Sequence, residues 1–337
     1  MRCAKSLLLV LLFLAGLDRG VAQSAEPVKI RMAWTVVPFE IMPVLFTVPG
    51  VMKHLGTSYT VEFPHFQSSS SMFAPLASGD VDIASLSAFS FTSAIQRAGM
   101  NDLRILADEY EDGVDGYLTG QFVVLNDGPI HKIEDIKGKV VASFGLGSSG
   151  DMASRVMLRK HGLEDKRDYT VIEANGNNMP AMLFDHKVDL INTTGFTSHD
   201  PDVIAKTRSL FNRREAFGGP SQETVIVGHI GFIEKNRAAL VDYFEDELRA
   251  LNWCLDPKNH AAAIALVAAF TKAPASRFES WMFTKDDEYR DPQGVPKLAD
   301  FQRAIDVEHD FGLIQKTIDV TQYTDLSLVK EAASRLK

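Results

Sequence analysis

The sequence predicts an α/β protein of two lobes, each built on a mostly parallel sheet. Three observations support this fold class: strand and helix patterns alternate from residue 28 to residue 109, a second alternation begins near residue 121, and another strand pattern covers residues 223–230. About 312 residues lie beyond the N-terminal segment described next, enough for two α/β lobes of ordinary size. Because the chain would pass between the lobes twice, we expect two hinge crossovers and a cleft that closes on a ligand.

The N-terminus has the pattern of an export signal. Arg2 and Lys5 precede an apolar run over residues 7–17, which is too short to span a bilayer as a helix, and small residues follow it. We therefore predict a signal peptide over residues 1–25, cleaved near Ala22 or Ala25. Cys3 precedes the apolar run instead of ending it, so a lipid anchor is not indicated.

Removal of this segment makes the chain more acidic. Residues 1–25 contain three basic residues and one acidic residue, so the formal net charge falls from −9 to −11. Nucleic acids and anionic membranes require clustered cations, and neither is expected as a partner. Of the two cysteines only Cys254 would remain, which excludes an intramolecular disulfide and favours a buried structural thiol.

The first lobe is predicted to contain residues 26–120 and 229–337. The expected elements, in order, are a strand at 28–34, a helix at 43–55 interrupted near Pro49, a strand at 59–66, a helix at 71–78, a strand at 81–86, a helix at 88–98 and a strand at 103–109. Everything after residue 234 has a helical pattern.

The second lobe is predicted to contain residues 121–228. Its expected elements are a strand at 121–125, a strand at 140–142, a helix with apolar positions at Met152, Val156, Met157 and Leu158, a strand at 170–173, a helix at 179–186 and a strand at 188–192. The strand pattern at 223–230 would then lead the chain back to the first lobe.

Serine-rich loops stand at the ends of short strands between Pro64 and Ser93. One run of four serines, residues 68–71, comes just before a predicted helix. Hydroxyl groups and free helix N-terminal amides are neutral donors that suit an anion or a zwitterion. One of the serines is expected to cap the following helix instead.

Three segments resemble a known family. They are Leu76-Ala77-Ser78-Gly79-Asp80-Val81-Asp82-Ile83-Ala84, Ile133-Glu134-Asp135-Ile136-Lys137-Gly138-Lys139-Val140 and residues 318–329. In order and separation they are similar to the periplasmic solute-binding proteins of ABC importers, in the type 2 group that includes sulfonate, taurine and nitrate binders and thiamine-precursor-binding relatives. The resemblance implies a two-lobed type 2 periplasmic binding protein fold, a periplasmic location, an inner-membrane permease with its ATPase as partner, and a monomer.

The resemblance also implies that the ligand lies between the lobes, at the C-terminal ends of strands, as in other open α/β sheets. The first-lobe positions most able to face the cleft are Trp34, Thr35, Pro38, Ser69, Ser70, Ser71, Ser87 and Phe89. The aromatic ring of Trp34, directly after the first strand, would stack on a planar ligand or an alkyl chain, which favours an organic ligand over nitrate.

On the second lobe, residues 147–150 resemble the ligand-facing turn of the family. The candidate ligand-binding residues there are Gly147, Ser148, Ser149, Asn177, Thr194 and Phe196. Arg213 and Arg214 stand beside Glu215, a pattern typical of a solvated face, so neither is predicted to contact the ligand.

Cofactor, metal and catalytic sites are not expected. Residues 145–150 fit Gly-x-Gly-x-x-Gly, but the acid near the required distance, Asp168, precedes a strand instead of closing one. The sequence has no Gly-x-Ser-x-Gly elbow and no His-Glu-x-x-His or Cys-x-x-Cys pair.

We therefore expect the solute-binding component of an ABC transporter, which captures a small organic anion or zwitterion such as a sulfonate or a carboxylate, with aromatic acids included. Two alternatives of the same fold stay open: a thiamine-precursor or pyrimidine binding protein or enzyme, and a ligand-sensing domain. The enzyme would need a reactive cysteine or a cofactor lysine in the cleft, and Cys254 belongs to a late helix. The sensor would need a transmembrane or effector segment, for which the sequence shows no pattern.

Overall fold

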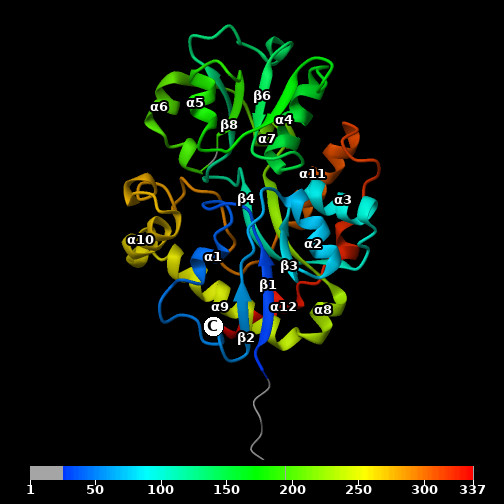
Figure 1. The fold of residues 1–337 in the computed structure, drawn as a ribbon, viewed down its shortest axis with the longest axis vertical. Helices are drawn as coiled ribbons and strands as arrows, with labels where there is room; N and C mark the ends of the chain where they lie inside the picture. The colour runs from blue at the N-terminus through cyan, green and yellow to red at the C-terminus, as the bar shows by residue number, and fades with distance from the viewer. Residues whose placement is uncertain (1–25, 194, 337) are drawn as a thin grey trace, which may run out of the picture.

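The computed structural model describes residues 26–193 and 195–336 and contains two five-stranded sheets in two lobes (Figure 1). The predicted signal peptide lies outside the described residues. Four strands of each sheet run in one direction and the fifth is reversed, so the expected two-lobed α/β fold with mostly parallel sheets is confirmed.

The first sheet has the strand order β2-β1-β3-β10-β4. Its strands are β1 (Val28–Ala33), β2 (Tyr59–Glu62), β3 (Ile83–Leu86), β4 (Leu103–Asp112) and β10 (Ser221–His229). Strand β1 is parallel to β2 and β3, with Val28 opposite Tyr59 and Met32 opposite Ile83. Strand β10 is antiparallel to both of its neighbours.

The second sheet has the strand order β7-β6-β8-β5-β9. Its strands are β5 (Gln121–Leu125), β6 (Val140–Ser143), β7 (Thr170–Glu173), β8 (Leu190–Thr193) and β9 (Thr207–Asn212). Strand β6 is parallel to β7 and β8, whereas β5 is antiparallel to β8 and β9. In each sheet the reversed strand is the one that enters from the other lobe.

The chain crosses between the sheets after β4 and again before β10. Because β10 hydrogen-bonds to β3 and β4 along most of its length, residues 221–229 belong to the first sheet. The predicted limit of the second lobe at residue 228 therefore falls inside this strand. Judged by the sheets, the second crossing comes before Ser221, earlier than the sequence pattern indicated.

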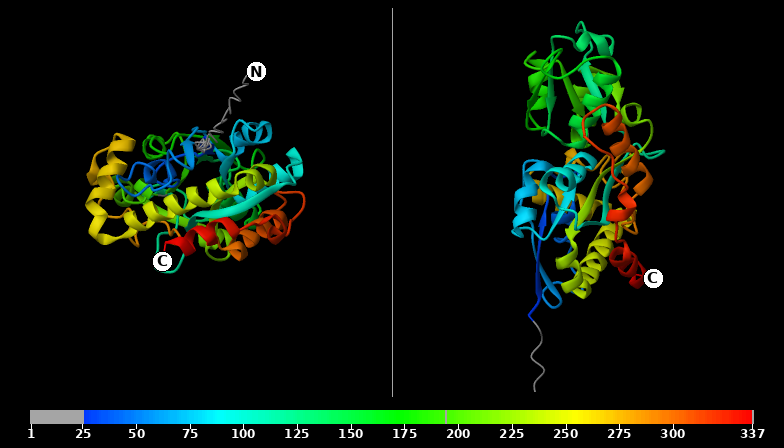
Figure 2. Two further views of the ribbon diagram at one scale, coloured as in Figure 1. Left: turned by 90° about the horizontal axis from the view of Figure 1, so that it is seen from below. Right: turned by 90° about the vertical axis from the view of Figure 1, so that its right-hand side faces the viewer.

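Helices cover the faces of both sheets. They are α1 (Met42–Leu45), α2 (Phe73–Ser78), α3 (Ala88–Ala98), α4 (Ser149–Lys160), α5 (Met179–Phe184), α6 (Pro201–Lys206), α7 (Arg213–Phe217), α8 (Ile230–Lys235), α9 (Arg237–Leu255), α10 (His260–Thr271), α11 (Leu298–Asp310) and α12 (Ser327–Arg335). The C-terminal helix packs on the first lobe, far from the second (Figure 2). In the described residues, no helix has both the length and the apolar character needed to cross a bilayer.

Two predicted helical regions are largely irregular. The helix expected at 43–55 ends at Leu45, because Asp246 of α9 accepts hydrogen bonds from the amides of Lys53 and His54 at 2.8 and 2.9 Å and holds that segment in turns. Residues 272–297 contain no α-helix and return to the first sheet, where Tyr289 forms an isolated bridge with Glu111.

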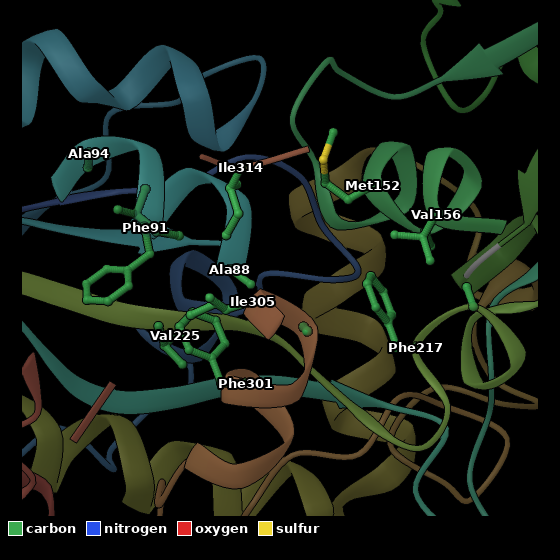
Figure 3. Close-up of a cluster of buried hydrophobic side chains, with 14 of the residues drawn as sticks. Ala88, Phe91, Ala94, Met152, Val156, Phe217, Val225, Phe301, Ile305 and Ile314 are labelled. Carbon is green, nitrogen blue, oxygen red and sulfur yellow. The ribbon is translucent and has the colours of Figure 1, made fainter. Parts of the chain in front are cut away.

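One hydrophobic cluster joins the two lobes beside the cleft. Phe91 of α3 and Phe301 of α11 belong to it from the first lobe, and Met152 of α4 and Phe217 of α7 from the second (Figure 3). Truncating a buried phenylalanine to alanine typically costs about 3–5 kcal/mol, so this shared cluster stabilises the arrangement of the lobes as well as each fold.

Candidate functional site

A cavity of about 170 Å³ lies between the lobes, at the ends of the strands of both sheets. The first lobe lines it with Thr35, Val36, Phe39, Glu40, His65, Phe66, Gln67, Ser68, Ser69, Ser87, Tyr110 and Thr224. The second lobe lines it with Phe144, Gly145, Ser148, Ser149, Gly150, Asn175, Gly176, Asn177, Phe196 and Arg213. We call these two sets the first-lobe wall and the second-lobe wall.

The structure brings about half of the predicted site residues to this cavity. Those in its lining are Thr35, Ser69, Ser87, Ser148, Ser149, Asn177 and Phe196. Those outside the lining are Trp34, Pro38, Ser70, Ser71, Phe89 and Gly147. Thr194 lies outside the described residues.

The residues outside the lining have other partners. The indole N–H of Trp34 donates to the Phe63 carbonyl at 3.0 Å, and its ring makes edge contacts with His65 and Phe270, so it packs on the first-lobe core. Ser71 forms a reciprocal cap with Ser68 at the start of the turn before α2, as expected for one of the four serines.

Serine hydroxyls also join the lobes directly. Ser87 and Ser90 donate to the carbonyl of Gly147 at 3.2 and 3.3 Å, and Ser70 donates to the carbonyl of Leu146 at 3.4 Å. Gly147 has a φ of +81°, and a Cβ there would lie 2.6 Å from Ser70 Oγ, so only glycine allows this approach. These serines therefore hold the lobes together in the closed arrangement.

The N-terminus of α4 forms the centre of the second-lobe wall. Ser148 caps the helix by accepting from the Asp151 amide at 3.3 Å, and Ser148, Ser149 and Gly150 all line the cavity. A Cβ on Gly150 would lie 3.0 Å from Asn192 Nδ2 and 3.2 Å from Arg213 Nη2. The glycine thus leaves room for two side-chain donors beside a helix start, the arrangement that suits a negative group.

Arg213 is the buried cation of this wall, and sequence reasoning missed it. The side chain is 6% exposed and forms an ion pair with Glu223, with Asp112 3.9 Å away. Burial opposes its charge, but Glu223 and Asp112 together raise the pKa of Arg213 above its ordinary value. Glu215, which suggested a solvated face, instead forms a capping box with Asn212 at the start of α7.

The first-lobe wall contains a buried acid, Glu40. Glu40 is 2% exposed, and burial raises its pKa to about 7 although the Thr35 amide donates to it at 2.6 Å. Burial and the neighbouring Glu40 raise the pKa of Glu109 on β4 well above its ordinary range. Burial also raises the pKa of the Tyr110 hydroxyl, so the phenol stays neutral. The sequence around Glu40 carried no signal for this role.

Comparison with known families and structures agrees with this geometry. A family model described as the phosphonate periplasmic substrate-binding protein of ABC transporters matches residues 51–184. No curated protein matches the chain. The alkanesulfonate-binding protein SsuA from Xanthomonas axonopodis pv. citri, bound to MOPS, superposes with a TM-score of 0.67 at 17% identity, over 90% of this chain and 99% of that one.

Residues 51–184 are thus similar to the periplasmic substrate-binding proteins of ABC transporters, and the two-lobed fold agrees with that likeness. The chain is also similar to the nitrate-binding protein NrtA from Synechocystis PCC 6803, with a TM-score of 0.67 and 14% identity over 93% of this chain and 90% of that one. At these identities the solved structures establish the fold and leave the ligand open.

An enzyme shares the fold of this chain. The desulfurization enzyme DszB superposes with a TM-score of 0.62 at 12% identity, over 92% of this chain and 100% of that one. Cys254 of the present chain lies in α9, is 1% exposed and is absent from the cavity lining. Burial raises the pKa of its thiol to about 12, as expected for a structural cysteine.

The described residues contain one group with metal-ligating side chains, His54, Asp242 and Glu245. Arg335 lies 2.9 Å from Asp242 and 3.6 Å from Glu245, so a guanidinium already compensates these carboxylates. The group takes no part in the cavity lining.

Proposed function

We propose that this binding protein captures a small organic anion or zwitterion in the cavity between its lobes and delivers it to a membrane permease driven by a cytoplasmic ATPase. The observation that carries the proposal is the second-lobe wall, where the start of α4 and the buried Arg213 converge on the space that Gly150 leaves open. The anionic group of the ligand, a sulfonate or a carboxylate, would occupy this space.

The chemistry of that space favours firm but reversible binding. The amides at the helix start donate without a net charge, and the charge of Arg213 is shared with Glu223. Asn192 Nδ2 is buried and finds no hydrogen-bond partner within the described residues, so an anion would satisfy it. Such a site holds an oxyanion in a nearly dry cleft and leaves it free to depart when the lobes separate.

Aromatic rings favour an organic part on the ligand. Phe39, Phe66 and Tyr110 line the cavity from the first lobe, and Phe144 and Phe196 from the second. The rings of Phe39 and Phe144 meet edge to face, with 5.9 Å between their centroids. This contact brings the two walls together over the ligand space. An alkyl or aromatic group would pack between these rings, and inorganic nitrate would leave them without a partner.

The same rings support a second candidate, a thiamine-precursor or pyrimidine binding protein. Its planar ligand would stack between the aromatic walls, with Asn175 and Asn177 as hydrogen-bonding partners for ring nitrogen atoms. We do not extend the proposal to an enzyme, because no cysteine lines the cavity in the described part of the chain.

Thermal unfolding of residues 26–337 with matched panels of sulfonates, carboxylates, phosphonates, pyrimidines and inorganic anions tests the proposal. A ligand at about 100 times its dissociation constant adds roughly 2.7 kcal/mol to the unfolding free energy. We expect one organic anion class to raise the melting temperature and Ser149→Ala to weaken the response. A response to pyrimidines alone would select the second candidate, and a response to nitrate alone would contradict the organic ligand.

The exported form follows from the same proposal. Mass spectrometry of the protein secreted to the periplasm is expected to show a mature N-terminus after Ala22 or Ala25. A single monomeric species is expected in solution, which light scattering checks.

A further inference from the structure

The first-lobe wall contains one acid, Glu40, and a second buried acid, Glu109, acts on it from outside the cavity lining. Glu40 lines the cavity, is 2% exposed, and accepts a hydrogen bond from the Thr35 amide through Oε2. Behind it Glu109 is 5% exposed, and its Oε2 finds no hydrogen-bond partner within the described residues. The charged groups that act on Glu109 are Glu40, Asp108, Glu247 and Arg290, and those that act on Tyr110 are Glu40, Arg213, Glu223 and Glu288.

Both nearby guanidinium groups already have anionic partners. Arg213 pairs with Glu223 and Asp112. Arg290 lies 3.1 Å from Asp287 and donates to the carbonyls of Pro38 and Phe39 at 2.8 and 3.0 Å. In the described part of the chain, therefore, no basic side chain forms an ion pair with Glu40.

We infer that Glu40 is the specificity-determining residue of the cavity and selects a ligand whose second end carries a cationic N–H donor, such as a protonated amine. The inference rests on the proposed function, because the anionic end of the same ligand would lie near Gly150 and Arg213. An ammonium group that donates to a buried carboxylate forms a strong charge-assisted hydrogen bond. An apolar or anionic group in the same place would give the acid of Glu40 no partner beyond those of the first lobe, such as the Thr35 amide.

Binding of such a ligand has a defined proton balance. The pKa of Glu40 is raised to about 7 by burial, so near neutral pH the empty cavity holds the acid partly protonated. When the ammonium group enters, the O–H bond of Glu40 breaks, its proton passes to the solvent, and the carboxylate accepts a hydrogen bond from the ligand. Ligand binding near neutral pH therefore releases protons. A ligand without a cation favours the neutral acid and takes a proton up.

Pairs of ligands that differ only in an amine test the inference by calorimetry: 2-aminoethanesulfonate with ethanesulfonate, 3-aminopropanoate with propanoate, and 2-aminoethylphosphonate with ethylphosphonate. We expect the amine to tighten binding by about 10- to 100-fold in at least one pair. Glu40→Gln, which keeps the shape and the acceptor for Thr35, should abolish most of that preference. The exposed Glu234→Gln on α8 is the matched control and should leave it unchanged.

The direction of proton exchange gives a second, independent readout. Titrations at pH 7 in two buffers of different ionisation enthalpy should show proton release for the wild-type protein and none for Glu40→Gln. Equal binding of both members of every pair, or proton uptake with the amine, would overturn the inference and leave the proposed function intact. If neither member of any pair binds, and the wider panel is also silent, the proposed function fails and the inference fails with it.

Discussion

The two walls of the cavity are built from equivalent strand ends, yet their chemistry differs. The second-lobe wall offers donors: the start of α4, two asparagines and Arg213. The first-lobe wall offers acceptors and rings: Glu40 in front of Glu109, with Phe39 and Tyr110 beside them. A ligand that spans the cavity therefore meets hydrogen-bond donors on the second-lobe wall, which we also call the donor wall, and the acid Glu40 on the first-lobe wall.

The walls also differ in how they affect stability. The second-lobe donors belong to a helix start, where unpaired amides are normal, and Arg213 is charge-compensated. The first-lobe acids are desolvated, and the orphaned oxygen atoms of Glu109, Glu247 and Glu288 show that the protein alone does not satisfy them within the described residues. Keeping these acids buried thus costs the first lobe stability.

The largest expected effect is a dependence of stability on pH that comes from the buried acids of the first lobe. Burial raises the pKa of Glu40 and Asp108 to about 7 and that of Glu111 and Glu247 to about 8 in the folded protein. Their contribution to stability is complete below the pKa values of the unfolded chain, which are near 4. It is lost as the pH rises through 7 to 8. The free energy of unfolding should fall from pH 5 to pH 8, by about 1.4 kcal/mol per pH unit for each extra proton that the folded state holds.

Denaturant unfolding at several pH values, without ligand, measures this slope. Glu247→Gln should flatten it and raise stability at pH 8, and Glu234→Gln should do neither. The acids with lowered pKa values, such as Glu134 and Asp168, act with the opposite sign and only below their ordinary pKa values near 4, outside this window. A stability that rises between pH 5 and pH 8 would show that the first-lobe acids are ionised in the folded protein.

The second prediction removes the cation of the donor wall. Arg213→Ala leaves Glu223 and Asp112 buried and uncompensated, and breaking a buried pair in this way typically costs about 3–5 kcal/mol. The neighbouring Arg214 pairs with the exposed Asp115, so Arg214→Ala should cost no more than about 1 kcal/mol. Urea unfolding at pH 7 compares the two variants, and equal costs would mean that the Arg213 pair is not desolvated as the structure shows.

The third prediction fills the space on the donor wall without removing a charge. Gly150→Ala places a methyl group within 3.0 to 3.2 Å of Asn192 Nδ2 and Arg213 Nη2. We expect ligand binding at least about 10-fold weaker, because an anion and the methyl group would compete for one space, with a smaller effect on stability. Gly231→Ala in α8, where nothing lies within 4 Å of the new Cβ, is the control and should bind as wild type. Unchanged binding by Gly150→Ala, measured by calorimetry, would place the anion elsewhere.

The comparison of the walls also shows what local pattern can predict. The alternation of strands and helices predicted nine of the ten strands of the two sheets, since these carry apolar runs of their own. Strand β9 (Thr207–Asn212), with the sequence Thr-Arg-Ser-Leu-Phe-Asn, has no such run and was not predicted. Ser148 and Ser149 were predictable because a glycine–serine turn before an amphipathic helix marks a helix start. Glu40, Arg213 and Glu109 were not, because their roles depend on tertiary contacts, such as that between Glu40 and Glu109, which no local pattern shows. Residues 272–297 supply the buried Arg290 and Glu288, and the helical pattern expected after residue 234 did not reveal that contribution.

The smallest expected effects concern the hydrogen bonds that join the two walls. Ser87 both caps α3, by accepting from the Ser90 amide at 3.3 Å, and donates across the cleft to Gly147. The Ser90 hydroxyl also donates to Gly147 and lies 3.3 Å from the Ser70 hydroxyl, but it caps no helix. Ser87→Ala should therefore cost about 1–2 kcal/mol and Ser90→Ala about half as much, measured by urea unfolding without ligand. Ser87→Asp keeps the cap but meets the Gly147 carbonyl with an acceptor, so it should stay folded and weaken ligand binding through a less stable closed state. If Ser90→Ala lowers the free energy of unfolding more than Ser87→Ala does, the cap of α3 contributes less to stability than the hydrogen bond between the walls. Closure would then depend on the hydroxyl groups that cross the cleft more than on the capped helix start.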